Sequence, residues 1–271
     1  MQGQKTADTE LAELLTGLAI KASAAILAVD FRNAGTRRKE DNSAVTLADE
    51  AAQAVILEGV GRLLPGVAVV SEEAVADWRG RELPAEFLMV DPLDGTAEFL
   101  AGRLEYTVNI ALVRSGTPVV GVVAAPALSL LWRGSASHAE RLTFTGEAVT
   151  APEPIRTRPW PTGERVAAVS RSHFDPASDA FLKRIAPVKP LACGSALKFC
   201  RLAEGAADVY PRLAPTSEWD VAAGHAVLVA AGGIVLTPGG SDLRYGHAGE
   251  GFRVRGFTAW GDPAAARQLS A

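Results

Sequence analysis

The sequence predicts a mixed fold in which an α+β first half is followed by an α/β second half. Two helical patterns occupy the chain up to residue 64, short β-branched runs follow them, and beyond residue 161 strand-like and helical segments alternate. The chain of 271 residues is long enough for one large domain or two subdomains, and its hydrophobic content of 48% is ample for a buried core.

Two amphipathic helices are expected in the N-terminal region. Leucine and isoleucine recur at helical spacing over about residues 9–31, with polar residues between them. A polar, charged stretch at residues 32–43 is typical of a solvated loop. A second helix then begins near Thr46 or Asp49 and ends at the breaker sequence of residues 64–66.

Strands dominate the next part of the chain. Short apolar and β-branched runs predict them at residues 67–70, 87–90, 106–113, 118–125, 130–132 and 141–144. A short helix fits residues 96–100. Residues 150–161 contain four prolines and no apolar period, which is typical of a boundary. We therefore expect an N-terminal α+β subdomain, residues 1–155, and a C-terminal α/β subdomain, residues 156–271.

Strands and helices alternate in the second half. The pattern predicts strands at residues 165–170, 188–191 and 208–210, and helices at residues 177–185, 195–203 and from Asp220 to about Ala231. The last helix is rich in alanine and valine, so we expect it to be buried.

Composition excludes several classes of function. The formal net charge of −4 argues against a protein that coats a nucleic acid polymer or an anionic membrane. The first residues lack the apolar core of a secretion signal, and the longest uncharged stretch, residues 115–132, is broken by prolines, so no transmembrane segment is expected. Cys193 and Cys200 fit neither a redox pair nor a zinc site and suit a reducing compartment. We expect a cytoplasmic protein with a small-molecule partner.

Carboxylates follow two of the predicted strands directly. Ser71-Glu72-Glu73 comes after the strand at residues 67–70, and Asp91-Pro92-Leu93-Asp94-Gly95-Thr96 comes after the strand at residues 87–90. A buried carboxylate without a partner costs several kcal/mol, so an apolar run that ends in acids indicates a bound cation.

The hexapeptide at residues 91–96 suits Mg²⁺. Pro92 fixes its own φ and Gly95 permits a positive φ, so the turn can bring Asp91 and Asp94 to one point. Oxygen ligands of this kind are preferred by Mg²⁺, and the amides that open the short helix can face an anion. The alternative is an ordinary Asx-Pro turn in which Asp94 or Thr96 caps the helix.

A third acidic signal lies at residues 218–224. Asp220 stands where the long apolar helix begins, so taken alone it is more simply explained as a helix N-cap. Together with Glu72, Asp91 and Asp94 it forms a set of acids at strand and helix ends. Such a set can converge on one metal-lined cleft between the two subdomains.

These motifs resemble the metal-dependent, lithium-sensitive phosphatase superfamily that includes inositol monophosphatase. The resemblance rests on the acidic pair at residues 72–73, the hexapeptide at residues 91–96 and the segment 219–224, and it covers nearly the whole chain. Longer strings at residues 39–49, 170–173, 194–200 and 210–212 are most similar to the bacterial 3'(2'),5'-bisphosphate nucleotidase branch, the CysQ type. The resemblance implies a layered α-β-α-β-α sandwich.

The resemblance also implies the residues of the site. Two magnesium ions, with a more weakly held third, are expected on Glu72, Asp91, the backbone carbonyl of Leu93, Asp94, Asp220 and Asp49. Catalytic roles fall to Asp49, Glu72 and Thr96. Glu72 and Thr96 would hold a metal-activated water that attacks the phosphate in line, with no covalent phosphoenzyme, and Asp49 would hold Thr96.

The substrate implied by the resemblance is adenosine 3',5'-bisphosphate, which would lose its 3'-phosphate to give AMP. The sulfated analogue, 3'-phosphoadenylyl sulfate, is a second expected substrate, with a place in sulfur assimilation. In inositol-cleaving relatives a carboxylate lies seven residues before the position of Asp220, where this chain has Leu213 beside Arg212, which favours a more anionic substrate. The expected substrate contacts are Glu72, Leu93, Asp94, Gly95, Thr96, Ser172, His173, Ser195, Lys198, Arg212 and Asp220, with Arg171 near the second phosphate.

Two alternatives stay open at this point. The first is an inositol or sugar phosphate monoesterase of the same superfamily. The second is a module that binds nucleotide or Mg²⁺ without catalysis. A cytoplasmic protein could also be peripheral on the cytoplasmic face of the inner membrane, and the sequence leaves the oligomeric state open.

Overall fold

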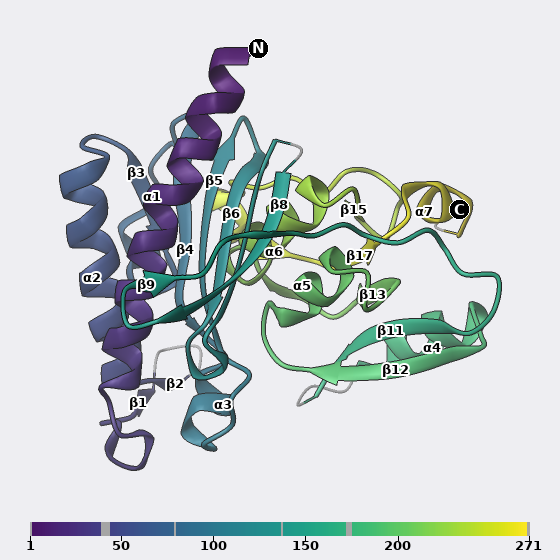
Figure 1. Ribbon diagram of the computed structural model, residues 1–271, viewed down its shortest axis with the longest axis horizontal. Coiled ribbons are helices and arrows are strands. Elements are labelled where there is room, and N and C mark those ends of the chain that lie inside the picture. Colours follow the sequence, from purple (N-terminus) through teal and green to yellow (C-terminus); the bar gives the residue numbers. More distant parts are fainter. Residues whose placement is uncertain (1, 39–43, 79, 137, 172–174, 270–271) are drawn as a thin grey trace.

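Five layers of helix and sheet build the molecule (Figure 1). The computed structural model describes residues 2–38, 44–78, 80–136, 138–171 and 175–269. Helices α1 (Gln2–Leu27) and α2 (Leu47–Leu63) cover one face of a large sheet, and α5 (Leu197–Ala203) and α6 (Trp219–Ala230) cover the other. A smaller sheet follows, with α4 (Pro176–Arg184) and α7 (Pro263–Leu269) outside it. The expected layered α-β-α-β-α sandwich is confirmed.

The large sheet has eight strands in the order β10-β8-β7-β6-β5-β4-β3, with β9 paired to β8. Its strands are β3 (Ala68–Ser71), β4 (Glu86–Asp94), β5 (Thr107–Arg114), β6 (Thr117–Ala125), β7 (Leu130–Ser135), β8 (His138–Thr145), β9 (Ala148–Val149) and β10 (Glu153–Pro154). Every pair in it is antiparallel except β3 with β4, which run parallel. That parallel pair defines the edge at which the acids gather.

The small sheet has five strands in the order β12-β11-β13-β17-β15. They are β11 (Arg165–Ser170), β12 (Val188–Cys193), β13 (Val209–Arg212), β15 (Ile234–Leu236) and β17 (Phe257–Trp260). The first three lie near their predicted positions, whereas β15, β17 and α7 were not predicted. Two short ladders complete the structure, β1 (Arg37–Arg38) with β2 (Ala44–Val45) and β14 (Thr216–Ser217) with β16 (Arg253–Val254).

Alternate residues of the large sheet belong to two separate hydrophobic cores. On β4, Leu88 and Val90 pack toward α1 and α2, while Phe87 and Met89 pack toward α5 and α6. A third core lies between the small sheet and its outer helices, around Trp260. The middle core contains residues of both sheets, so α6 packs against both halves of the chain. The division into two subdomains at residue 155 therefore stays a prediction.

Helix α6 lies unusually close to the large sheet. A Cβ added to Gly121 would come within 2.3 Å of the Ala223 carbonyl oxygen, and one added to Gly134 within 2.7 Å of the Val227 Cα. Glycine is therefore required on β6 and β7 where the helix crosses them. This close contact fixes the position of the first turn of α6 relative to the large sheet.

The first helix differs from its expected limits at both ends. It starts at Gln2, and Asp8 in its opening turns accepts two hydrogen bonds from Arg114 of β5, at 2.8 and 3.1 Å. It stops at Leu27, and a separate 3₁₀ turn, Phe31–Asn33, is capped by Asp30. Local capping chemistry thus overrides an apolar pattern that continues to residue 31.

Two further expectations concern the environment of the chain. Cys193 and Cys200 are buried free thiols, as expected. Among the described residues, none of the helices combines the length and hydropathy needed to cross a bilayer.

Candidate active site

Glu72 and Asp91 are brought together by strand pairing. In the parallel pair β3–β4, Ser71 lies opposite Val90, so the next residue on each strand follows at the same edge of the sheet. Glu72 opens a 3₁₀ helix, Glu72–Trp78, and Asp91 continues β4. The prediction that two strands deliver carboxylates to one edge is therefore confirmed in its geometry.

A β-bulge re-aims the second half of the acidic turn. Asp91 pairs with Asn109 and Asp94 pairs with Thr107. Between these two pairs, β4 therefore contains one residue more than β5. In a regular strand, residues three apart point to opposite faces, whereas the extra residue lets both carboxylates line the same pocket. Pro92 has no N–H to lose and tolerates the irregular position.

Asp220 reaches the same place from the other half of the chain. It lies in the first turn of α6, whose N-cap residue is Glu218, so the simpler prediction that Asp220 is the N-cap is wrong. Its carboxylate instead accepts hydrogen bonds from the Thr216 hydroxyl and from the Ser217 N–H, at 3.2 Å for the latter. These contacts orient it toward the edge of the large sheet.

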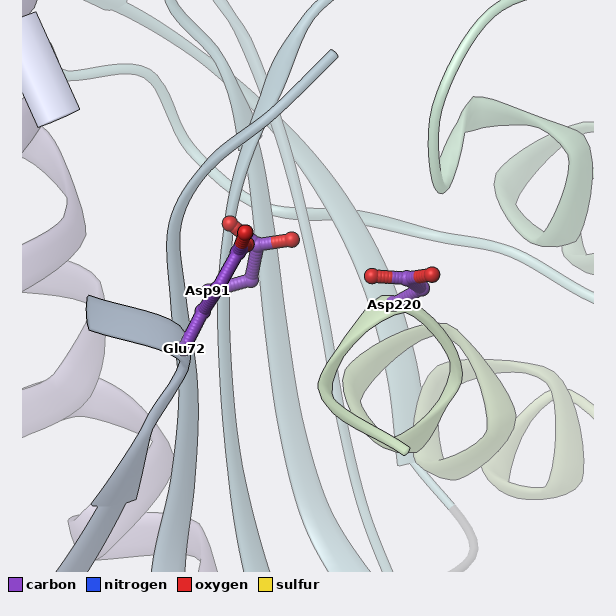
Figure 2. Close-up of side chains that lie close together, drawn as sticks. All are labelled: Glu72, Asp91 and Asp220. Carbon is purple, nitrogen blue, oxygen red and sulfur yellow. The ribbon is translucent and has the colours of Figure 1, made fainter. Parts of the chain in front are cut away.

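Three carboxylates meet in a space that one cation can fill. Ligand oxygens of Glu72, Asp91 and Asp220 all lie within 4.8 Å of one another. Figure 2 shows Glu72 and Asp91 side by side at the strand ends, with Asp220 facing them from the end of α6. Asp94 lines the same pocket but stands outside this group of three, where Thr107 and Asn109 donate to its Oδ2 at 3.4 and 3.3 Å.

Burial makes it unfavourable for the acids of this cluster to be ionised without a cation. Burial, and then the charge of Glu72, raise the pKa of Asp91 well above its ordinary value. Burial and the charge of Asp220 raise the pKa of Asp94 to about 7, although Lys198 opposes the change. The cluster therefore favours either bound protons or a bound cation.

The donor set fits a hard divalent cation. Carboxylate and carbonyl oxygens are the ligands that Mg²⁺ prefers, and Leu93 lines the same pocket as Asp91 and Asp94. A cation would also remove the repulsion that raises the pKa of both aspartates. Mg²⁺ at Glu72, Asp91 and Asp220 is thus compatible with the residues present.

Thr96 is held by the carboxylate of a neighbouring helix. Its hydroxyl donates to Asp49 Oδ1 at 3.1 Å, with the Leu93 carbonyl oxygen at 3.3 Å. Asp49 Oδ2 accepts from both the N–H and the hydroxyl of Thr46, at 2.7 and 2.6 Å, which forms the capping box of α2. Burial raises the pKa of Asp49 from its ordinary value although these hydrogen bonds act against it. Asp49 is therefore placed to orient Thr96.

Cationic side chains line the same pocket as the acids. The cavity has a volume of about 840 Å³, and Lys198, Arg212 and Arg253 border it from the second half of the chain. Lys198 is only 3% exposed and donates to the Ser195 carbonyl oxygen at 2.7 Å. The Nε of Arg212 is buried, with no acceptor among the described residues. The pocket therefore offers both carboxylates for a cation and basic groups for an anion.

Ser195 ties the acidic turn to the second half. It adopts a positive φ of 50°, and its hydroxyl is 2.9 Å from the carbonyl oxygens of both Asp94 and Glu105. A Cβ on Gly95, whose φ is +94°, would lie 2.4 Å from the Ser195 hydroxyl oxygen. The Ser195 side chain is thus committed to the backbone of the turn, and the glycine is needed for their approach.

Several expected contacts lie elsewhere. Ser172 and His173 fall outside the described residues. Arg171 does not border the pocket; it donates to Glu105, at 2.8 and 3.0 Å, and to the Ala192 carbonyl oxygen. Leu213 packs against the third core and is not among the residues that line the pocket, whereas Arg212 lines it, so the substrate argument built on Leu213 stays a prediction. Asp49 lies outside the group of three acids, and its role toward a third ion stays a prediction.

Two residues of the site were not singled out from the sequence. Arg253 belongs to no recognisable motif and enters the pocket only because β16 pairs with β14. Glu218 is two residues before Asp220 and fully buried. An acid directly before an apolar helix is a signal for a cap, and its actual partners lie in a distant loop.

The comparison with protein families now decides the family. Residues 7–261 match the model of the inositol monophosphatase family. The chain belongs to this family. The family resemblance expected from the acidic motifs is thereby confirmed over almost the full length.

Individual relatives agree with this assignment. This member of the family is 42% identical over 221 residues to the 3'(2'),5'-bisphosphate nucleotidase CysQ of Salmonella typhimurium, which covers 80% of this chain and 87% of the relative. It is 40% identical over 220 residues to the protein of the same name from Escherichia coli, with the same coverage.

Solved structures give the same result for the fold. The crystal structure of CysQ from Bacteroides thetaiotaomicron matches with a TM-score of 0.77 at 33% identity, over 93% of this chain and 97% of that one. An inositol monophosphatase structure from Anabaena matches with a TM-score of 0.74 at 25% identity, over 97% and 94% of the two chains.

Proposed function

We propose that this protein is a Mg²⁺-dependent phosphatase that removes the 3'-phosphate of adenosine 3',5'-bisphosphate to give AMP and phosphate. 3'-Phosphoadenylyl sulfate is the second proposed substrate. The observation that supports this best is that one pocket is lined both by the acids Glu72, Asp91 and Asp220 and by the basic residues Arg212 and Arg253. The relatives named as nucleotidases, at 40–42% identity, support the same substrate.

The acids of the pocket provide the proposed metal ligands. Glu72, Asp91, Asp94, Asp220 and the carbonyl oxygen of Leu93 would hold two Mg²⁺ ions. A divalent cation bound there supplies Lewis acidity, which lowers the pKa of a water molecule and neutralises charge on phosphate oxygens.

Thr96 is the proposed positioning group for the attacking water. Because its hydroxyl proton is directed to Asp49 Oδ1, a lone pair of the Thr96 oxygen is left to accept a hydrogen bond from water. Glu72, which lines the same pocket, is the second proposed acceptor for this water. Two acceptors fix the direction of its lone pair, which is what an in-line attack on phosphorus requires.

The basic residues of the pocket are the proposed contacts for the rest of the nucleotide. Arg212, with its buried Nε, and Lys198 offer donors and positive charge to the second phosphate. Inositol monophosphates lack a second phosphate and leave these groups unpaired. This contrast favours the nucleotide over the alternative substrate.

Phosphate release from a substrate panel tests the proposal. The panel contains adenosine 3',5'-bisphosphate, 3'-phosphoadenylyl sulfate, inositol 1-phosphate and fructose 1,6-bisphosphate, each with Mg²⁺ and with EDTA. We expect the highest kcat/KM for the adenosine bisphosphate and no release with EDTA. A higher kcat/KM for inositol 1-phosphate would replace the nucleotidase proposal by the monoesterase alternative, and nucleotide binding without release would favour the non-catalytic module.

A further inference from the structure

A buried acid outside the acidic cluster holds a loop that borders the pocket at Gly251. Glu218 is 0% exposed and does not border the pocket itself. Its Oε2 accepts from the N–H of Gly246 at 2.6 Å, and its Oε1 accepts from the N–H of His247 at 3.0 Å. The Nδ1 of His247 lies 2.6 Å from the same Oε1. A buried carboxylate with three N–H partners is fully satisfied and holds its partners in one geometry.

The backbone closes the same connection. The N–H of Glu218 donates to the Phe252 carbonyl oxygen at 2.8 Å, and the N–H of Phe252 donates to the His247 carbonyl oxygen at 3.0 Å. Residues 246–252 therefore form a closed loop seated on Glu218. We call this loop the Glu218 loop.

The Glu218 loop is connected to two residues of the pocket, Arg253 and Asp220. Directly after the loop, Arg253 pairs with Ser217 in the β14–β16 ladder, and its side chain borders the pocket. Ser217 and Thr216, on the other strand of the ladder, are the residues that hold the Asp220 carboxylate. Movement of the Glu218 loop would thus be transmitted to Arg253 and to Asp220 together.

We propose that Glu218 is a positioning residue of the active site. Its buried carboxylate holds the Glu218 loop against the first turn of α6, and so fixes Asp220 for Mg²⁺ and Arg253 for the distal anionic group of the substrate. No acidic side chain of the described part of the chain forms an ion pair with Arg253, so its charge is available to a ligand. The inference extends the proposed function and rests on it for the role of Arg253.

Three variants distinguish a positioning role of Glu218 from an effect of its charge and from a general loss of stability. Glu218→Gln keeps the size of the side chain but turns an amide NH₂ toward one of the N–H donors, so at least one hydrogen bond is lost. Gly246→Ala leaves Glu218 charged and strains the loop, because Gly246 has a φ of +95°. Asp208→Asn is the matched control, since Asp208 is 1% exposed, binds Arg158 and the Val166 N–H, and does not border the pocket.

The readouts are the Kd of Mg²⁺ by isothermal titration calorimetry, KM and kcat for adenosine 3',5'-bisphosphate, and the melting temperature. We expect Glu218→Gln to raise the Mg²⁺ Kd about tenfold, the size typical of lost support to a metal ligand, and to raise KM. Gly246→Ala is expected to raise both values in the same direction. Asp208→Asn is expected to lower the melting temperature and to leave both values unchanged at a temperature where all variants are folded.

Each contrary result overturns the proposal in a different way. An unchanged Mg²⁺ Kd in Glu218→Gln, or equal losses in Asp208→Asn, would reduce Glu218 to an ordinary structural acid. A raised Kd in Glu218→Gln with an unchanged Kd in Gly246→Ala would assign the effect to charge. If Glu218→Gln does not fold, the proposal is tested by comparing the Mg²⁺ Kd of Gly246→Ala with that of Asp208→Asn. Because calorimetry needs no turnover, a failure of the nucleotidase proposal would not affect the Mg²⁺ comparison.

Discussion

Asp91 shows what a single buried side chain does in this site. It is 1% exposed, accepts a hydrogen bond from the Leu93 N–H at 3.0 Å, and lies within 4.8 Å of ligand oxygens of Glu72 and Asp220. Its ionised form is destabilised by burial and by Glu72, so without a cation the folded protein either binds a proton at Asp91 or carries an unfavourable charge there.

Asp91→Asn is therefore expected to have opposite effects on activity and stability. Phosphate release should fall by more than about a hundredfold, because a metal ligand is lost. The melting temperature in EDTA should rise by about 2–4 °C, because the uncharged amide removes the repulsion. Differential scanning calorimetry and a phosphate assay measure the two effects. Near wild-type turnover at saturating Mg²⁺ would show that the metal site is misplaced.

The raised pKa of Asp94 predicts how the metal-free protein responds to pH. Its folded pKa of about 7 lies above the ordinary value of 3.8, so between these values the folded state binds more protons than the unfolded state. The contribution of Asp94 is thus fully present below about pH 4 and is lost as the pH rises to about 7. In EDTA we expect the melting temperature to fall from pH 5 to pH 8, and to fall less in Asp94→Asn. An equal slope in both proteins would contradict the assignment.

Thr96 offers a test of the proposed water position. Thr96→Val removes the hydroxyl and keeps the shape, so kcat should fall by about 10²-fold or more while the Mg²⁺ Kd by calorimetry stays unchanged. Thr96→Ser keeps the hydroxyl and the contact with Asp49, and should retain most of the activity. A Thr96→Val variant with wild-type kcat would remove Thr96 from the mechanism.

At the scale of single residues, the sequence predicted the acids better than their partners. Glu72, Asp91 and Asp220 were expected to converge and do so. Arg253 and the loop bonded to Glu218 were not expected, because their partners lie 28 to 36 residues apart along the chain and no local pattern marks them.

At the scale of elements, the position of α6 on the large sheet decides where Asp220 lies. The helix crosses β6 and β7 at two glycines, and the crossing at Gly121 has no room for a Cβ. A larger residue there would push the helix away from the sheet and move its first turn.

Gly121→Ala is accordingly expected to lower the free energy of unfolding by about 2 kcal/mol, the usual cost of overpacking, and to raise the Mg²⁺ Kd. Gly17→Ala is the matched control, because Gly17 lies on the exposed face of α1 with nothing within 4 Å of an added Cβ. That control should be neutral or stabilising by about 0.5–1 kcal/mol. Urea unfolding measures both, and a neutral Gly121→Ala would refute the close contact.

Element prediction succeeded where the pattern is local. The short helix α3 (Thr96–Leu100) and the strand β11 were predicted at their observed limits. β15 and β17 were missed because each is only three or four residues long and acquires its strand conformation from pairing with distant segments.

At the scale of the whole molecule, the site joins the two halves of the chain. Glu72 and Asp91 come from the large sheet, and Asp220 comes from a helix that packs between the sheets. Arg171 and Ser195, from the second half, also bind Glu105 of the first half. A cation in the acidic cluster would therefore stabilise the contact between the halves.

Mg²⁺ is thus expected to stabilise the entire chain in one transition. At a concentration of 100 times its Kd, it should raise the free energy of unfolding by about 2.7 kcal/mol. Asp220→Asn should lose most of this increase while keeping its metal-free stability. Urea unfolding followed by circular dichroism, with Mg²⁺ or EDTA, measures the difference. Equal stabilisation of Asp220→Asn and the wild type would place the cation elsewhere.

The sequence by itself determined the helices and strands with a clear apolar period and the acids at the strand ends, because these are local properties of the chain. The layered fold and the family followed from the resemblance of its motifs to a known phosphatase superfamily. The tertiary structure decided which acids meet, since the β4 bulge, the parallel pairing of β3 with β4, and the glycine contacts of α6 set distances between residues far apart in sequence. It also decided that Ser195 binds backbone, that Arg171 lies outside the pocket, and that Arg253 lies within it. Such contacts depend on the packing of separate elements, which no local pattern encodes.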